Sequence, residues 1–171
     1  SESAINTLPS EAWLINYTPY SYPQALLHIP PEGLLFEEKI RMTHPPITWV
    51  EGFARLFPLE QLDSLGFDLF SAAFYLASGY AFYQSEARDA HDRHDERYLF
   101  PVQQKLHAYP WVNHYAHYLS DKLEQQTGHT PSLPKGDYHL TWDIDHPWAY
   151  RHQGLFRQLW GSAGDLRHFG I

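Results

Sequence analysis

The chain has 171 residues, of which 43% are hydrophobic, 16% aromatic and 19% charged, so its composition is that of about one globular domain. Twelve Lys and Arg against 20 Asp and Glu give a net charge of −8, which argues against nucleic-acid binding because that function needs clustered cations. The absence of cysteine excludes disulfides and thiolate metal sites. No apolar run reaches the roughly 20 residues that cross a bilayer, and Ser1–Ala4 lack the basic start and apolar core of a signal peptide. We therefore expect a cytoplasmic protein without a membrane partner.

Short strands and loops are predicted for the first third of the chain. Residues 12–17 are typical of a strand, which Thr18-Pro19 ends. Two apolar runs, 25–29 and 34–38, flank the loop Pro30-Pro31-Glu32-Gly33, and this order predicts a hairpin. Residues 47–50 are a further strand candidate.

Two helices are predicted in the middle of the chain. The first covers 67–78, with Asp68 as N-cap, and its apolar residues on nearly every face predict the buried centre of the domain. A polar stretch, 85–98, is expected to be an exposed connection. The second helix runs from about Pro110 to Gln126, with Gly128 just beyond its end. Its predicted apolar stripe consists of Val112, Tyr115, Ala116, Leu119 and Leu123.

A loop rich in Thr, Pro, Gly and Ser, 128–137, leads to the C-terminal part. Residues 138–145 are predicted to form a strand, and Asp145-His146-Pro147 to begin a helix. The elements together predict an α+β fold. In it, a small mixed or antiparallel sheet packs on the buried central helix and the second, amphipathic helix, and a C-terminal strand–helix unit follows.

Asp143 and Asp145 form the sharpest candidate site. Alternate side chains of a strand share a face, so both carboxylates are expected to point the same way where the strand ends. Two close carboxylates suit a divalent cation, or a base beside a metal ligand. The alternative is that Asp145 only caps a helix and Asp143 is a loop residue at the end of the strand.

Histidine pairs are the alternative metal candidates. His91 and His94 have His-x-x-His spacing with acidic neighbours, and His114 and His117 lie three apart on the second predicted helix. The alternative for the first pair is a solvated charged connector, and for the second an exposed helix surface.

Four segments resemble, in the same order, an uncharacterised N-terminal domain of bacterial polysaccharide deacetylase-like proteins, known mostly from Bacteroidetes. Phe67–Tyr80 resembles the central helix of that domain, Ile29–Glu37 its early hairpin, and Asp89–Tyr98 its polar connector. Thr141–Gly154 resembles the segment that opens the deacetylase-like part, and it is the most specific of the four. The resemblance implies an accessory domain over 1–134, followed by the first strand and helix of a deacetylase-like domain over 135–171.

The family implies metal-dependent removal of acetyl groups from sugars. By its Thr-Phe-Asp-Asp motif, Asp143 would be the catalytic base and Asp145 the metal ligand, although here Ile144 separates the two acids. No His-x-x-x-His follows Asp145 in this sequence. A divalent metal, with zinc as the first choice, is therefore expected in the complete parent protein and not in this fragment. The fragment alone is not expected to be catalytic. The expected partners are the remainder of its own polypeptide and carbohydrate. The alternatives are a non-catalytic glycan-binding or scaffolding domain and a histidine-based metal-binding protein.

Overall fold

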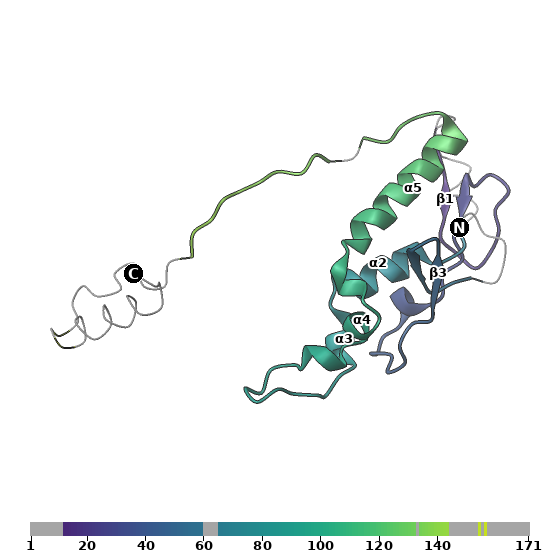
Figure 1. The fold of residues 1–171 in the computed structure, drawn as a ribbon. Coiled ribbons are helices and arrows are strands. Elements are labelled where there is room, and N and C mark those ends of the chain that lie inside the picture. Colours follow the sequence, from purple (N-terminus) through teal and green to yellow (C-terminus); the bar gives the residue numbers. More distant parts are fainter. Residues whose placement is uncertain (1–11, 60–64, 133, 144–153, 155, 157–171) are drawn as a thin grey trace. The chain divides into compact units, whose positions relative to one another are not determined.

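A computed structural model of the chain describes residues 12–59, 65–132, 134–143, 154 and 156 (Figure 1). The chain divides into two compact units, Ser1–Ser132 and Leu133–Ile171. All the helices and strands named below belong to the first unit.

The first two strands pair with each other. β1 (Ile15–Asn16) and β2 (Leu27–His28) run parallel, and the backbone N–H of Ile29 donates to the carbonyl of Asn16 at 2.9 Å just beyond them. The predicted hairpin of 25–29 with 34–38 is therefore wrong. Gly33 has a φ of 119°, which favours glycine, and the chain then turns into the 3-10 helix η1 (Leu34–Phe36) instead of a second hairpin strand.

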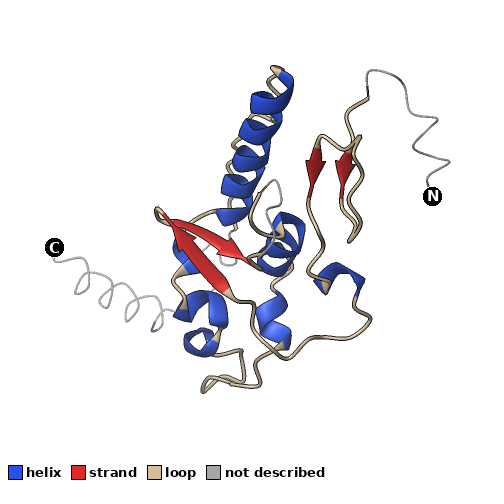
Figure 2. Cartoon of the chain, turned by 90° about the vertical axis from the view of Figure 1, so that its right-hand side faces the viewer, coloured by secondary structure: helices blue, strands red, loops and turns tan. Residues whose placement is uncertain are grey.

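A separate hairpin follows. β3 (Ile47–Val50) pairs antiparallel with β4 (Phe53–Leu56), and Figure 2 shows the two strand pairs in red. Glu51 and Gly52 between them both have positive φ, at 50° and 82°, which is the geometry of a two-residue hairpin turn. The strand over 47–50 was predicted, whereas β4 was not. In β4, Ala54 and Leu56 are fully buried, so this strand supplies the core side of the hairpin.

Both predicted helices are confirmed. α2 (Leu69–Ala77) begins after Asp68, whose side chain caps it, and α5 (Trp111–Thr127) ends at Gly128, which adopts the left-handed conformation. α2 packs against α5, β4 and η1. The largest fully buried apolar side chains of the core are Leu27, Ile29, Leu56, Phe57, Phe67, Tyr75, Leu106 and Tyr115.

The stripe predicted on α5 is only partly correct. Tyr115 is fully buried, Val112, Leu119 and Leu123 are partly buried, and Ala116 is exposed. Trp111, which was not predicted, is buried in the core. The packed face therefore begins at Trp111, one residue before the predicted start at Val112. The aromatic ring of Trp111 buries more apolar area than the methyl group of Ala116 could.

Short helical turns connect α2 to α5: α3 (Tyr80–Tyr83), η2 (Glu96–Tyr98), α4 (Phe100–Gln103) and η3 (Leu106–Ala108). Among the helices that the structure describes, none is both long and apolar enough to cross a membrane.

The described part of the second unit is irregular. Residues 134–143 carry no strand, so the prediction of a strand from Tyr138 is wrong as far as Asp143. A strand needs a neighbour to bond its backbone groups, and no described segment pairs with these residues. The predicted continuation through Asp145 into a helix lies outside the described residues. The fold class of the described elements is α+β, as predicted, with two separate strand pairs in place of one sheet.

Candidate functional site

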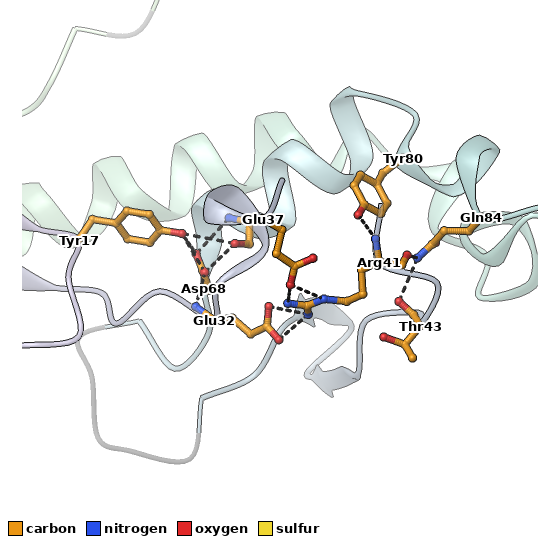
Figure 3. Close-up of polar contacts among 9 residues, drawn as sticks. Tyr17, Glu32, Glu37, Arg41, Thr43, Asp68, Tyr80 and Gln84 are labelled. Atoms are coloured by element: carbon orange, nitrogen blue, oxygen red, sulfur yellow. Dashed lines mark hydrogen bonds and ion pairs between the residues drawn. The ribbon is translucent and has the colours of Figure 1, made fainter. Parts of the chain in front are cut away.

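The carboxylate of Asp68 is completely buried and is the centre of a polar network (Figure 3). Its Oδ2 accepts hydrogen bonds from the Tyr17 hydroxyl at 2.9 Å, the Ser71 hydroxyl at 2.7 Å and the Glu32 backbone N–H at 2.8 Å. Its Oδ1 accepts the backbone N–H of Ser71 at 3.0 Å, as the N-cap of α2. The described residues offer no cation to pair with it, so these donors and the helix N-terminus stabilise its charge.

Tyr17 remains a proton donor in this network. Burial is the largest cause that raises the pKa of its phenol above the usual value, and the nearby carboxylate of Asp68 acts in the same direction. The neutral hydroxyl therefore persists at neutral pH and keeps its hydrogen bond to Asp68.

Arg41 organises the neighbouring loop. Its guanidinium reaches both carboxylate oxygens of Glu32, at 2.6 and 2.8 Å, and also pairs with Glu37 (Figure 3). The hydrogen bonds that its guanidinium donates to Glu37, and then those to Glu32, are the largest causes that raise its pKa. Its backbone N–H donates to the hydroxyl of Tyr80 at 2.6 Å, so the loop is held against α3.

Gln84 completes the network at the end of α3. Its amide Nε2 donates to the carbonyls of Arg41 at 2.7 Å and Thr43 at 2.9 Å, and its Oε1 accepts the hydroxyl of Tyr75 at 2.8 Å. The polar groups from Tyr17 to Gln84 thus satisfy one another. We therefore interpret this network as a device that fixes the fold and not as a catalytic centre.

A hollow of about 530 Å³ lies elsewhere in the same unit, beside the junction of α2 and α3. Its walls also come from α4, η3 and the start of α5. Most of the lining is apolar, with Glu96, His107 and Asn113 as polar members. Two of its aromatic residues, Phe82 and Tyr109, are also 43% and 61% exposed.

A second hollow, of about 390 Å³, lies in the charged loop before α4. Asp89 holds the guanidinium of Arg93, with 2.7 Å between Oδ2 and Nη2, and Asp95 holds Arg97 at 2.6 Å in the same way. Hydrogen bonds from Arg93 lower the pKa of Asp89, and the side-chain hydrogen bond from Arg97 is the largest cause that lowers the pKa of Asp95. The predicted connection is thus mostly exposed, but it is ordered by internal ion pairs and by the burial of Asp95.

The predicted histidine candidates of this loop have other neighbours. The backbone N–H of His91 donates to Asp89 Oδ1 at 2.8 Å. His94 Nδ1 lies 2.8 Å from Nη1 of Arg88, and its ring packs edge-on against Phe82 with 5.3 Å between centroids. A guanidinium beside Nδ1 occupies the position where a metal ion would bind that nitrogen.

The second pair, His114 and His117, lies on the exposed surface of α5, and the His114 ring packs near Trp111. Within the described ranges, no three His, Asp or Glu side chains gather in a way that could hold a metal ion. The described part of the chain therefore does not join either histidine pair to a third ligand.

Asp143 is exposed at the end of the irregular segment, and Asp145 lies outside the described residues. The sequence identified Asp68 only as a helix cap and did not single out Glu32, Arg41 or Gln84. Most partners of these residues are 9 to 43 residues away, so they leave no local pattern. The exception is Arg41 with Glu37, whose i,i+4 spacing is local.

Comparison with known proteins finds no curated protein and no solved structure that matches. A family model matches residues 2–128, which cover the whole polar network and both hollows. The family is described only as one of unknown function, so the match names no activity. The chain belongs to the DUF7033 family.

Proposed function

We propose that this chain is the N-terminal accessory region of a longer polysaccharide deacetylase-like protein, and that the parent protein removes acetyl groups from sugars. The observation that carries the proposal is the exposed apolar alternation before Asp143. Tyr138, Leu140 and Trp142 are 82%, 61% and 78% exposed and alternate with polar residues. Such alternation is typical of a strand that buries one face in a sheet, which the rest of the polypeptide would supply.

The alternation overlaps the start of Thr141–Gly154, the segment that resembles the opening of the deacetylase-like part. In the parent protein, Asp145 would contribute one carboxylate to a divalent metal ion, with zinc as the first choice. Asp143 would accept the proton of the attacking water. The metal, when bound, lowers the pKa of water and polarises the acetyl carbonyl. Carboxylate donors fit such an ion, but these two do not complete its ligand set, and further ligands would come from the rest of the polypeptide.

The role proposed for the first unit is non-catalytic. Its buried carboxylate, that of Asp68, already accepts four hydrogen-bond donors and faces no solvent, so it is poorly suited to accept a proton from a substrate. A unit with such an internally satisfied polar network is suited to packing against the catalytic part or to presenting its substrate. The partners proposed are accordingly the remainder of the polypeptide and carbohydrate.

The test compares the complete gene product with the chain described here. Acetate release from tetra-N-acetylchitotetraose and from acetylated xylan is measured with added zinc. We expect release by the complete protein, its loss in Asp143→Asn and in Asp145→Asn, and no release by this chain alone. Asp137→Asn is the matched control, because Asp137 is exposed in the same unit, where it pairs with His139 and accepts the backbone N–H of Tyr138. Activity that survives both Asp143→Asn and Asp145→Asn, or no release from either substrate, would overturn the proposal.

Zinc calorimetry on this chain distinguishes the deacetylase proposal from the alternative of a histidine-based metal site. We expect no tight zinc binding in the wild-type chain or in Asp143→Ala/Asp145→Ala. Stoichiometric binding that persists in this double variant and disappears in His91→Ala/His94→Ala would replace the deacetylase proposal by a histidine-based metal site.

A further inference from the structure

We propose that the two hollows of the first unit form one binding site for a neutral oligosaccharide. The apolar hollow beside α3 would accept the C–H face of a sugar ring on Phe82 and Tyr109. The charged hollow, in the loop before α4, would bind the hydroxyl groups of the sugar. This site is made entirely of residues of the first unit and contains neither Asp143 nor Asp145.

The two hollows adjoin each other. Glu96 lines both of them. The Phe82 ring, on the wall of the apolar hollow, packs edge-on against the ring of His94, on the wall of the charged one. The two hollows therefore share Glu96 and meet where Phe82 contacts His94, so one extended ligand could contact both.

The apolar hollow offers aromatic surface that the fold does not use. Tyr109 is 61% and Phe82 43% exposed, although both line a concave surface. Burying an exposed aromatic ring under a flat apolar face is favourable, and one face of a pyranose ring consists of C–H groups. The volume of about 530 Å³ is within the range of small-molecule sites and accommodates more than one sugar ring.

The charged hollow offers fixed hydrogen-bonding groups. Arg93 donates to Asp89 through Nε and Nη2, so the orientation of its exposed guanidinium is set while Nη1 makes no hydrogen bond to any described residue. The same holds for Arg97 on Asp95. The loop itself is closed by backbone hydrogen bonds, from Asp89 N–H to the Arg93 carbonyl at 2.8 Å and from Asp95 N–H to the Ala87 carbonyl at 3.1 Å. Such groups bind without first losing conformational entropy.

The balance of charge selects a neutral ligand. The lining of the charged hollow contains the three carboxylates of Asp89, Asp95 and Glu96, and two guanidiniums. A polyanion would face an excess of carboxylates, and a polycation would face two arginines. A purely apolar ligand would offer no acceptor to Nη1 of Arg93 and of Arg97, which the ion pairs with Asp89 and Asp95 do not use. Hydroxyl groups, which both donate and accept, suit the mixture best.

Binding is tested on this chain by isothermal calorimetry and by NMR. The probes are tetra-N-acetylchitotetraose and cellotetraose as neutral saccharides, tetragalacturonate as an acidic one, and decanoate as an apolar one. We expect saturable binding of at least one neutral saccharide with a dissociation constant of about 1 mM or tighter. Because the ligand is uncharged, we expect its affinity to change less than about twofold when salt is raised.

Three variants locate the site. Tyr109→Ala and Phe82→Ala each remove a stacking surface, and Arg93→Gln removes the guanidinium, so each is expected to weaken binding by about fivefold or more. Tyr20→Ala is the matched control, because Tyr20 is 71% exposed and lines neither hollow. It is expected to bind as the wild-type chain does. Circular dichroism of each variant checks that the fold is retained.

The proposal is overturned if neither neutral saccharide binds, or if binding is unchanged in Tyr109→Ala and Phe82→Ala. It is also overturned if tetragalacturonate or decanoate binds at these residues and no neutral saccharide competes, since the site would then belong to an anionic or an apolar ligand. Acetate release plays no part in these measurements. The inference can therefore fail while the deacetylase proposal stands, and the reverse is equally true.

Discussion

The hydroxyl of Tyr17 lies 2.9 Å from Oδ2 and 3.1 Å from Oδ1 of Asp68, although 51 residues separate the two in the chain. Asp68 is the N-cap of α2, and Tyr17 directly follows β1. The hydrogen bond therefore ties the first strand pair to the start of the central helix. The carboxylate of Asp68 caps α2 and also accepts hydrogen bonds from two other segments. Local and long-range structure therefore depend on the same side chain.

Asp68→Ala is expected to destabilise the fold by about 2–4 kcal/mol, because it removes an N-cap and leaves several buried donors without an acceptor. The buried backbone N–H of Ser71 loses its only described acceptor. Urea unfolding followed by circular dichroism measures the loss.

Asp121→Ala is the control for this substitution, since Asp121 is exposed on α5. It is expected to change the free energy of unfolding by less than about 0.5 kcal/mol. Equal effects of the two substitutions would contradict the role assigned to Asp68.

Tyr17→Phe removes a donor from the Asp68 carboxylate but keeps the ring. The ring packs edge-on against Phe70, with 5.0 Å between centroids, and stacks on Phe36. We therefore expect a loss of about 1–2 kcal/mol, less than for Asp68→Ala, because three other donors remain. The same urea assay measures it, with Tyr20→Phe at an exposed position as the control. A loss as large as that of Asp68→Ala would mean that the ring has also moved.

Stability is expected to fall at alkaline pH. Burial raises the pKa values of Tyr17, Tyr75 and Tyr115 above their usual 10.0. The folded state thus keeps protons that the unfolded state releases, so stability is fully present below pH 10.0 and is lost as the pH rises above it.

Tyrosinate absorbance between about pH 8 and pH 12 checks this expectation. We expect the exposed tyrosines to ionise first. The buried tyrosines should ionise at higher pH, together with the loss of ellipticity. In denaturant all 12 tyrosines should ionise in one transition. A single transition near pH 10.0 in the native protein, without unfolding, would show that the three phenols are not buried as described.

The parts of the fold that were predicted correctly are those with local signals. Asp68 before an apolar run and Gly128 after the second helix mark helix ends through their own backbone preferences. The parallel pairing of β1 with β2 has no such signal. The strands are two residues each, and Leu27 finds its partner Ile15 only through the tertiary fold. The sequence around Gly33 was equally compatible with a hairpin.

The candidate site was predictable to a smaller extent. Histidines and paired carboxylates attract attention because of their chemistry, whereas Phe82 and Tyr109 resemble ordinary core residues in the sequence. Their exposure becomes evident only once α3 and η3 are in place. Asp89 and Arg93, by contrast, have the i,i+4 spacing of a local ion pair, although the sequence analysis did not single this pair out.

Gly79→Ala tests the wall of the apolar hollow. Gly79 has a φ of +65°, and a Cβ there would meet the Phe82 ring at 3.1 Å. Gly128→Ala is a matched control, because Gly128 follows α5 with a φ of +67° and an added Cβ meets nothing within 4 Å. Both substitutions are expected to cost about 1 kcal/mol for the left-handed backbone, and Gly79→Ala about 1 kcal/mol more because the Phe82 ring must move.

Thermal and urea unfolding of both variants measure this difference, and aromatic NMR shifts report on the ring itself. We expect the Phe82 and His94 resonances to shift in Gly79→Ala and to stay in place in Gly128→Ala, since the two rings are in contact. Equal losses of stability with unmoved resonances would mean that Phe82 rotates freely. The ring would then be too mobile to form the fixed stacking surface that the saccharide site requires.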